Sequence, residues 1–277
     1  MSLFLVGGGY APELGAAYDR FVAEAQQVHT KTRGQRCRIA IVMAPGGKPE
    51  WLTDYRSLVC ERWPEVQTEA IVLGETLIDT AGTDTTTEDA PTCAEDVSTT
   101  SRDDPFATCA GIIVCGGFVP DYLDHLSTYR VQISQAVASG VPYLGFSAGA
   151  HVVSKHALCG GWKDGTGHQV CPEAASDGLE EITIRDGLGL IGTTIETHTD
   201  AWSNLGVAMA VLDHDEIASS VAIDEATCLV VDHVTGRNYV LGEGRTHWFS
   251  QVDGVWIVRR EDGSTTKPFT RARRRRH

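Results

Sequence analysis

An apolar run, a tight turn and the start of a helix follow one another in Val141-Pro-Tyr-Leu-Gly-Phe-Ser-Ala-Gly-Ala-His151. The run up to Phe146 has the length and composition of a buried strand, and we expect a helix from about Ala148. The turn between them has the pattern G-x-S-x-G. Small residues around a serine let the backbone take the strained conformation that lifts the hydroxyl above the strand ends. The sequence therefore predicts a nucleophile elbow, with Ser147 as the nucleophile.

Short apolar, β-branched runs recur on both sides of this elbow, and the early ones are separated by stretches of helix length. The predicted strands are Leu3–Val6, Arg38–Met43, Val66–Leu73, Gly111–Cys115, Val141–Phe146 and Leu190–Thr197. The predicted helices are Pro12–Val28, Lys48–Arg62, Leu126–Ala138 and Asp200–Leu212. This alternation is typical of an α/β fold, here a three-layer α/β/α sandwich with a mostly parallel sheet. From Ser219 on, strands joined by turn signals predict C-terminal antiparallel hairpins.

Composition is ordinary for a globular protein, with 42% hydrophobic and 22% charged residues in a chain of 277. We find no repeat and no linker that divides the chain, so residues 1–277 are expected to form one domain. Residues 74–104, rich in Thr, Asp and Glu, are predicted to be an acidic surface loop insertion. Residues 268–277 carry an arginine run and are predicted to be a disordered basic tail.

Charge and cysteine usage exclude several classes of function. A net charge of −14 disfavours a nucleic-acid surface. No apolar run has the length of a membrane span, and the N-terminus is too short for a signal peptide. The eight cysteines have no C-x-x-C spacing, which suggests buried thiols in a reducing cytoplasm, with a Cys159–Cys171 disulfide left open. No His/Cys cluster has metal-ligand spacing, so we propose no metal and no cofactor.

A serine nucleophile needs backbone donors for the oxyanion and a base. Gly116-Gly117 follow the strand Gly111–Cys115, so the N–H groups of Gly117 and Ala148 are the predicted oxyanion hole, provided the two strands are neighbours. Among ten histidines, His198 is favoured as the base because it ends a predicted strand at the same edge of the sheet. His151 lies on the helix that leads away from the site.

The carboxylate that would orient His198 is less well defined by the sequence. Asp164 follows the turn Gly160-Gly161-Trp162 after the nucleophile helix and is the preferred acid. Glu173 and Glu196 are alternatives. Because Glu196 lies two residues before His198 on the same face of the predicted strand, it could instead line the substrate pocket.

In these features the chain resembles the serine peptidase family of aspartyl dipeptidase (peptidase E) and cyanophycinase. The resemblance covers roughly residues 1–245. Its pieces, in order, are Leu-Val-Gly-Gly-Gly, Val-Cys-Gly-Gly, Gly-Phe-Ser-Ala-Gly-Ala, the Gly-Gly turn at 160, Gly-Leu-Gly-Leu-Ile before Glu-Thr-His, and Val-Ala-Ile-Asp-Glu-Ala-Thr-Cys-Leu-Val-Val. The resemblance implies a class I glutamine-amidotransferase-like fold. It also implies a triad in the order Ser147, Asp164, His198, and a homodimer by analogy.

The chain departs from this family beside the predicted site. Phe118-Val119 replace the polar pair that follows the two glycines in the family, and Thr199-Asp200-Ala201-Trp202 stand where cyanophycinase carries arginines. We therefore expect Phe118, Glu196 and Trp202 to line a pocket that does not suit β-aspartyl-arginine or N-terminal aspartyl substrates.

The function predicted from these residues is hydrolysis of an amide in a small peptide or peptide-like substrate through an acyl-enzyme. One alternative is transfer of the acyl group to an acceptor in biosynthesis. The other is a ligand-binding protein without catalysis, which would have a histidine beyond hydrogen-bond reach of Ser147 and no carboxylate behind it.

Overall fold

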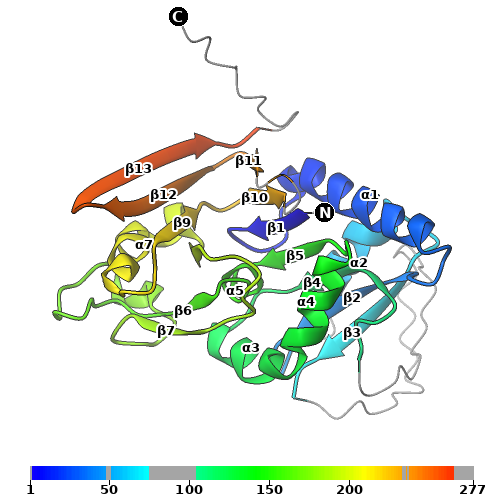
Figure 1. Cartoon of the computed structure of the whole chain (residues 1–277), viewed down its shortest axis with the longest axis horizontal. Helices are drawn as coiled ribbons and strands as arrows, with labels where there is room; N and C mark the ends of the chain where they lie inside the picture. Colours follow the sequence, from blue (N-terminus) through cyan, green and yellow to red (C-terminus); the bar gives the residue numbers. More distant parts are fainter. Residues whose placement is uncertain (1, 48–50, 75–103, 233–234, 236, 265–277) are drawn as a thin grey trace, which may run out of the picture.

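The structure is a computed structural model that describes residues 2–47, 51–74, 104–232, 235 and 237–264 (Figure 1). The loop insertion predicted at 74–104 lies almost wholly outside the described residues, as does the predicted basic tail at 268–277. The start of the predicted helix Lys48–Arg62 also lies outside them, at 48–50.

The centre of the molecule is a seven-stranded sheet in the order β11-β10-β1-β5-β4-β2-β3. Its strands are β1 (Ser2–Val6), β2 (Arg38–Met43), β3 (Gln67–Val72), β4 (Cys109–Val114), β5 (Tyr143–Phe146), β10 (Thr227–Asp232) and β11 (Arg237–Gly242). The five strands from β1 to β3 in this order are parallel, β10 pairs antiparallel with β1, and β11 pairs antiparallel with β10. Every residue of β1, β2, β4 and β5 is buried, which explains why they read as continuous apolar runs.

Helices cover both faces of this sheet, as the α/β/α prediction requires (Figure 1). After the short η1 (Pro12–Leu14), α1 (Gly15–Lys31) packs against α2 (Leu52–Cys60) on one face. The other face carries α3 (Val119–Leu126), η3 (Ser127–Tyr129), α4 (Arg130–Ala138) and α5 (Ala148–His151). The two faces follow from right-handed crossovers, because the chain moves outward along the sheet through α1 and α2 and returns from β4 to β5.

A second, four-stranded sheet has the order β13-β12-β9-β8. It consists of β8 (Thr194–Glu196), β9 (Ser219–Ile223), β12 (Arg245–Val252) and β13 (Val255–Asp262), with β8 parallel to β9. The strand predicted at Leu190–Thr197 is therefore shorter than expected and does not belong to the central sheet. The C-terminal hairpins divide between the sheets, because β10–β11 joins β1 whereas β12–β13 joins β9.

The segments between β5 and β9 fill the space beside the second sheet. They include the antiparallel pair β6 (His156–Gly160) and β7 (Thr183–Asp186), the short η4 (Glu173–Ala175), then α6 (Thr199–Trp202), α7 (Leu205–Ala210) and η5 (Val211–Asp213). The single helix predicted at Asp200–Leu212 is broken at Ser203, whose φ of 55° is left-handed. None of the helices in the described residues has the length and apolar character needed to cross a membrane.

Cys159 and Cys171 are both free, buried thiols, so the disulfide left open between them is not formed. Cys115 and Cys228 are also free and buried, and burial raises the pKa of both thiols. These four side chains behave as small apolar groups in the core.

Candidate active site

Ser147 lies at the turn from β5 into α5, where the carboxyl ends of β1, β5 and β4 lie side by side. Its backbone has φ 49° and ψ −111°, a conformation that residues with a side chain rarely adopt. The turn is fixed by a hydrogen bond of 3.0 Å from the Ser147 N–H to the carbonyl of Val6, the last residue of β1. The strained serine predicted from the G-x-S-x-G pattern is therefore present.

The two glycines of the pattern are needed for close packing of the turn. A Cβ at Gly149 would lie 2.2 Å from the carbonyl oxygen of Val114 in β4, and one at Gly145 would lie 2.3 Å from the carbonyl oxygen of Gly149. Neither position has room for a side chain. The glycines thus let α5 pack directly on β4 and β5, which sets the direction in which the Ser147 hydroxyl points.

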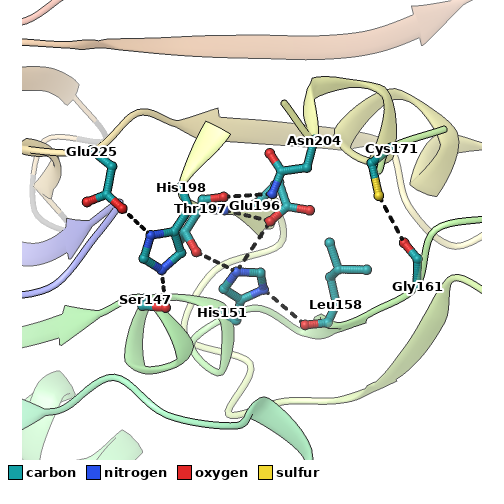
Figure 2. A network of polar contacts seen from close by, with 10 residues as sticks. All are labelled: Ser147, His151, Leu158, Gly161, Cys171, Glu196, Thr197, His198, Asn204 and Glu225. Atoms are coloured by element: carbon teal, nitrogen blue, oxygen red, sulfur yellow. Dashed lines mark hydrogen bonds and ion pairs between the residues drawn. The ribbon is translucent and has the colours of Figure 1, made fainter. Parts of the chain in front are cut away.

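His198 follows β8 and reaches Ser147 although β8 belongs to the second sheet. Its N–H donates a 2.7 Å hydrogen bond to the carbonyl of Gly7, the residue after β1, and its backbone is left-handed at φ 55°. This anchor brings the imidazole to the carboxyl edge of the central sheet. The Ser147 hydroxyl and the His198 Nε2 are 2.7 Å apart (Figure 2).

Glu225, in the connection from β9 to β10, pairs with the other nitrogen of His198, Nδ1 (Figure 2). The backbone N–H of Glu225 in turn donates a 2.8 Å hydrogen bond to a carboxylate oxygen of Asp200. Gly8 makes room for the pair, since a Cβ there would lie 1.7 Å from a carboxylate oxygen of Glu225. The carboxylate can only accept, so His198 Nδ1 carries the proton and Nε2 is free to accept from the Ser147 hydroxyl.

Glu225, and not the predicted Asp164, provides the carboxylate behind His198. The Asp164 carboxylate instead closes its own surface turn, accepting hydrogen bonds from the N–H groups of Thr166 and His168, both at 2.9 Å. A hydrogen bond from the Thr166 hydroxyl, at 2.7 Å, lowers the pKa of Asp164 most, and these two bonds lower it further. The preference for Asp164 is corrected because its carboxylate is used locally, and the alternative Glu173 is an exposed residue of η4.

A signal for Glu225 was present in the sequence. Asp224-Glu225-Ala226 forms a turn between two apolar runs, inside the Val-Ala-Ile-Asp-Glu-Ala-Thr segment already noted for its resemblance to cyanophycinase. A turn between strands at the edge of a sheet is a common position for functional side chains. Nothing in the local pattern says that this turn lies beside β1.

The two predicted oxyanion donors flank Ser147. β4 and β5 are neighbouring parallel strands, as that prediction required, so Gly116-Gly117 and Ser147 end adjacent strands. A Cβ at Gly116 would be 3.6 Å from the Cβ of Ser147. Ala148 is the first residue of α5, where a backbone N–H has no acceptor within the helix. Gly117 has φ 154°, which favours glycine.

Two cavities meet at Gly117. A small one, of about 30 Å³, is lined by Ser147, Gly161, Asp177, Glu196 and Trp202 among others. A larger one, of about 410 Å³, has mainly apolar and aromatic walls that include Tyr55 and Phe118. Of the residues predicted to line the substrate pocket, Glu196 and Trp202 thus lie in the cavity that contains Ser147, whereas Phe118 lies in its neighbour.

Trp202 also supports the histidine. Its ring lies parallel to the imidazole of His198, with 4.1 Å between ring centroids and 12° between planes. The backbone N–H of Trp202 donates a 2.8 Å hydrogen bond to the backbone carbonyl of His198. The single turn of α6 therefore folds the indole onto the imidazole and restricts its rotation.

Glu196 and His151 form a buried polar pair behind the serine (Figure 2). The Glu196 Oε1 accepts from the Thr197 N–H at 2.8 Å and lies 3.7 Å from the Nε2 of His151. Burial raises the pKa of Glu196 to about 8 and lowers that of His151 to about 4. No group of three or more His, Cys, Asp or Glu that could hold a metal occurs in the described part of the chain.

Two solved structures, described as a peptidase and as a putative peptidase E, are similar to this chain. The chain is 18% identical to a peptidase from an acI-B1 actinobacterium, with a TM-score of 0.56, and the match covers 97% of this chain and 96% of that one. A putative peptidase E from Listeria monocytogenes EGD-e is 13% identical, with a TM-score of 0.44, over 87% of this chain and 98% of that one. No family model matches the chain. No curated protein matches it either.

The actinobacterial match extends over nearly the whole length of both chains, so the protein has the fold of a solved peptidase. This agrees with the fold that the resemblance to the peptidase E and cyanophycinase family implied. At this identity the match concerns the fold, and the chemistry has to be argued from the site.

Proposed function

We propose that this protein is a serine hydrolase that cleaves an amide bond in a small peptide or peptide-like substrate. The observation that carries the proposal is the 2.7 Å contact between the Ser147 hydroxyl and His198, at an elbow with φ 49° and with Glu225 behind the histidine. Nucleophile, base and orienting acid in this sequence of contacts are the arrangement that activates a serine. A protein that only binds a ligand has no use for a strained serine with a base in reach.

In the proposed reaction, His198 takes the hydroxyl proton while Ser147 Oγ attacks the carbonyl carbon of the substrate. The N–H groups of Gly117 and Ala148 stabilise the oxyanion that forms. His198 then gives the proton to the leaving amine, the C–N bond breaks, and an acyl-enzyme remains. Water, deprotonated by His198, attacks the acyl carbon; the bond between that carbon and Ser147 Oγ then breaks, Ser147 Oγ takes the proton back from His198, and the acid is released. Glu225 holds the imidazole in place and stabilises its charged form.

Labelling with a fluorophosphonate tests this proposal, because the reagent phosphonylates only an activated serine. We expect the wild-type protein to be labelled on Ser147, as located by peptide mass spectrometry, and Ser147→Ala to remain unlabelled. Ser154→Ala is the matched control, since Ser154 is a fully buried serine in the same part of the chain. Labelling of the wild type at no more than the level of Ser147→Ala would show that the serine is idle.

A further inference from the structure

The large cavity beside the proposed active site occupies a crevice that the topology of the central sheet creates. β2 and β4 are neighbouring parallel strands. The chain leaves β2 towards α2 on one face of the sheet and leaves β4 towards α3 on the other face. In open α/β sheets, ligands bind where the connections of two neighbouring strands diverge in this way. The cavity, of about 410 Å³, lies at the carboxyl ends of these strands and has the volume of a small-molecule site.

Apolar and aromatic side chains line most of this cavity, including those of Met43, Ala44, Pro45, Trp51, Tyr55 and Phe118. The Cys115 thiol, also in the lining, is neutral near pH 7 because burial raises its pKa. Asp121, in the first turn of α3, is the one charged residue that the described part of the chain contributes to the lining. A carboxylate brought into the cavity would lose its hydration without meeting a cation of this lining, so the walls favour an uncharged, apolar ligand.

Phe118 presents part of its ring at this cavity. It directly follows the predicted oxyanion donor Gly117 and stands before the first residue of α3. The residue is 38% exposed although it is aromatic. Exposed apolar surface beside a concave site is where a ligand gains most from apolar contact. The uncovered part of the Phe118 ring is therefore available to pack against a substrate.

Two tyrosines hold the Gly116-Gly117 connection against the cavity. The Tyr122 hydroxyl donates a 3.3 Å hydrogen bond to the carbonyl of Gly116, and a Cβ at Gly117 would lie 3.2 Å from the Tyr122 ring. The backbone of Gly116 also forms a hydrogen bond with the side chain of Tyr55, which comes from α2. The connection that carries the predicted oxyanion donor is thus fixed between helices of the two faces, and it forms one wall of the cavity.

The order of the strands indicates which part of a substrate enters the cavity. Along the sheet, β1, β5, β4 and β2 follow one another. The cavity at β4 and β2 and the anchor of His198 at Gly7, after β1, therefore lie on opposite sides of Ser147. In the proposed reaction His198 protonates the leaving amine, so the amine has to lie on the β1 side. The acyl part then extends in the other direction, past Gly117 and towards the cavity.

We propose that the large cavity is a subsite for an aromatic side chain on the acyl part of the substrate, next to the scissile carbonyl. The inference rests on the proposed serine hydrolase function and specifies its substrate class. The rings of Tyr55 and Phe118 in the lining can pack edge-on or offset against a substrate ring. The substrate class is thus an amide whose acyl part carries a phenyl-sized apolar group, and an acidic side chain is disfavoured at the same place.

Boronic acids test the subsite without knowledge of the natural substrate, because the group on boron takes the place of the acyl part. In the reversible adduct, Ser147 Oγ bonds to boron, its proton passes to His198, and the boron becomes a tetrahedral anion. We would compare 2-phenylethylboronic acid with ethylboronic acid, which lacks the ring, and with 2-carboxyethylboronic acid, which replaces the ring by a carboxylate. Each inhibition constant is measured as protection of Ser147 from a neutral fluorophosphonate with short alkyl groups.

We expect the wild type to bind the 2-phenylethyl compound tenfold or more tightly than the ethyl compound, because the ring is removed from water. Phe118→Ala should lower this ratio about threefold to fivefold, and Phe118→Leu, which restores an apolar wall, should lower it less. Trp256→Ala is the matched control, since it removes a ring that is 39% exposed on β13, outside the cavity, and it should keep the wild-type ratio. Labelling without boronic acid shows that each variant is folded and reactive.

The two proposals fail differently. If the fluorophosphonate labels Ser147 but the 2-phenylethyl compound protects no better than the ethyl compound, the subsite is refuted and the hydrolase proposal stands. A ratio that is unchanged in Phe118→Ala, or that falls equally in Trp256→Ala, would also refute the subsite, as would equal or tighter binding of the 2-carboxyethyl compound. If the reagent does not label Ser147, the proposed function is wrong and the subsite with it.

Discussion

Gly8 has no side chain, and this is what allows the carboxylate of Glu225 to lie against the end of β1 and reach His198. Around the reacting atoms, several glycines are needed because they have no side chain. Gly145 and Gly149 permit close packing of the elbow, and Gly160 does so for Asp177. The polar side chains of the site are thus positioned by backbone packing more than by contacts of their own.

At the scale of single residues, Glu225→Gln tests which acid orients His198. The amide can offer a donor to Nδ1 and so favour the wrong imidazole tautomer, which in a serine triad costs about 10⁴-fold in rate. We expect the rate constant for fluorophosphonate labelling of Ser147 to fall by a similar factor.

Asp164→Asn is the control for this substitution, since that carboxylate serves only its own turn. It should label at nearly the wild-type rate. If Asp164→Asn slowed labelling as much as Glu225→Gln does, the assignment of Glu225 would have to be abandoned.

Among the elements, the short ones define the site. β8 has three residues, α5 and α6 have four each, and none would be stable alone. Each is held by neighbouring structure: α5 packs on β4 and β5, β8 pairs with β9, and the hydrogen bond from His198 to Gly7 anchors the residue before α6. The break at Ser203, which divides the predicted helix Asp200–Leu212, frees α6 to fold Trp202 back onto His198.

Gly149→Ala tests how far the elbow depends on direct packing of α5 on the sheet. The added methyl group would meet the carbonyl oxygen of Val114 at 2.2 Å, and overpacking of this kind costs about 3 kcal/mol. We expect the free energy of unfolding in urea to fall by about this amount and Ser147 labelling to be lost.

Gly192→Ala is the matched control, because a Cβ there has open space and its φ is not in the left-handed region. It should unfold at or slightly above the wild-type urea concentration. An equal loss of stability in both variants would mean that the elbow glycine has no special packing role.

At the scale of the whole molecule, the site lies between two sheets and combines residues from distant parts of the chain. Ser147 comes from the central sheet, His198 follows a strand of the second sheet, and Glu225 lies where the chain passes from β9 back to β10. Burial of Glu196 and His151 in the same region links the stability of the fold to pH.

The sign of this linkage follows from which state holds more protons. With its pKa raised from 4.5 to about 8, Glu196 keeps a proton in the folded state that the unfolded chain has released, so its contribution to stability is lost as pH rises through 8. His151, with its pKa lowered from 6.5 to about 4, acts oppositely and only below 6.5. The effect of Glu196 is therefore isolated between pH 6.5 and 8.

Glu196→Gln keeps an acceptor for the Thr197 N–H but does not titrate. Between pH 6.5 and 8 we expect its free energy of unfolding, measured in urea, to rise relative to the wild type by about 1–2 kcal/mol. Glu173→Gln, at an exposed position, should follow the wild type throughout. Parallel curves for the wild type and Glu196→Gln would show that Glu196 is ionised in the folded protein.

The sequence by itself determined the features that are local. The alternation of apolar runs and helices predicted the α/β/α architecture, and G-x-S-x-G predicted the strained turn at Ser147, because strand burial, helix periodicity and turn strain all act over a few neighbouring residues. It also singled out His198. That prediction assumed that the strand before His198 belongs to the central sheet, whereas this strand, β8, belongs to the second sheet.

Only the tertiary structure showed which carboxylate stands behind His198 and which two face the cavity beside Ser147. Glu225 follows His198 by 27 residues and approaches it because the β9–β10 turn crosses to the edge of β1, a consequence of strand order across two sheets. Strand order depends on long-range packing and not on local periodicity, so Asp164, Glu173 and Glu225 cannot be told apart from the pattern alone.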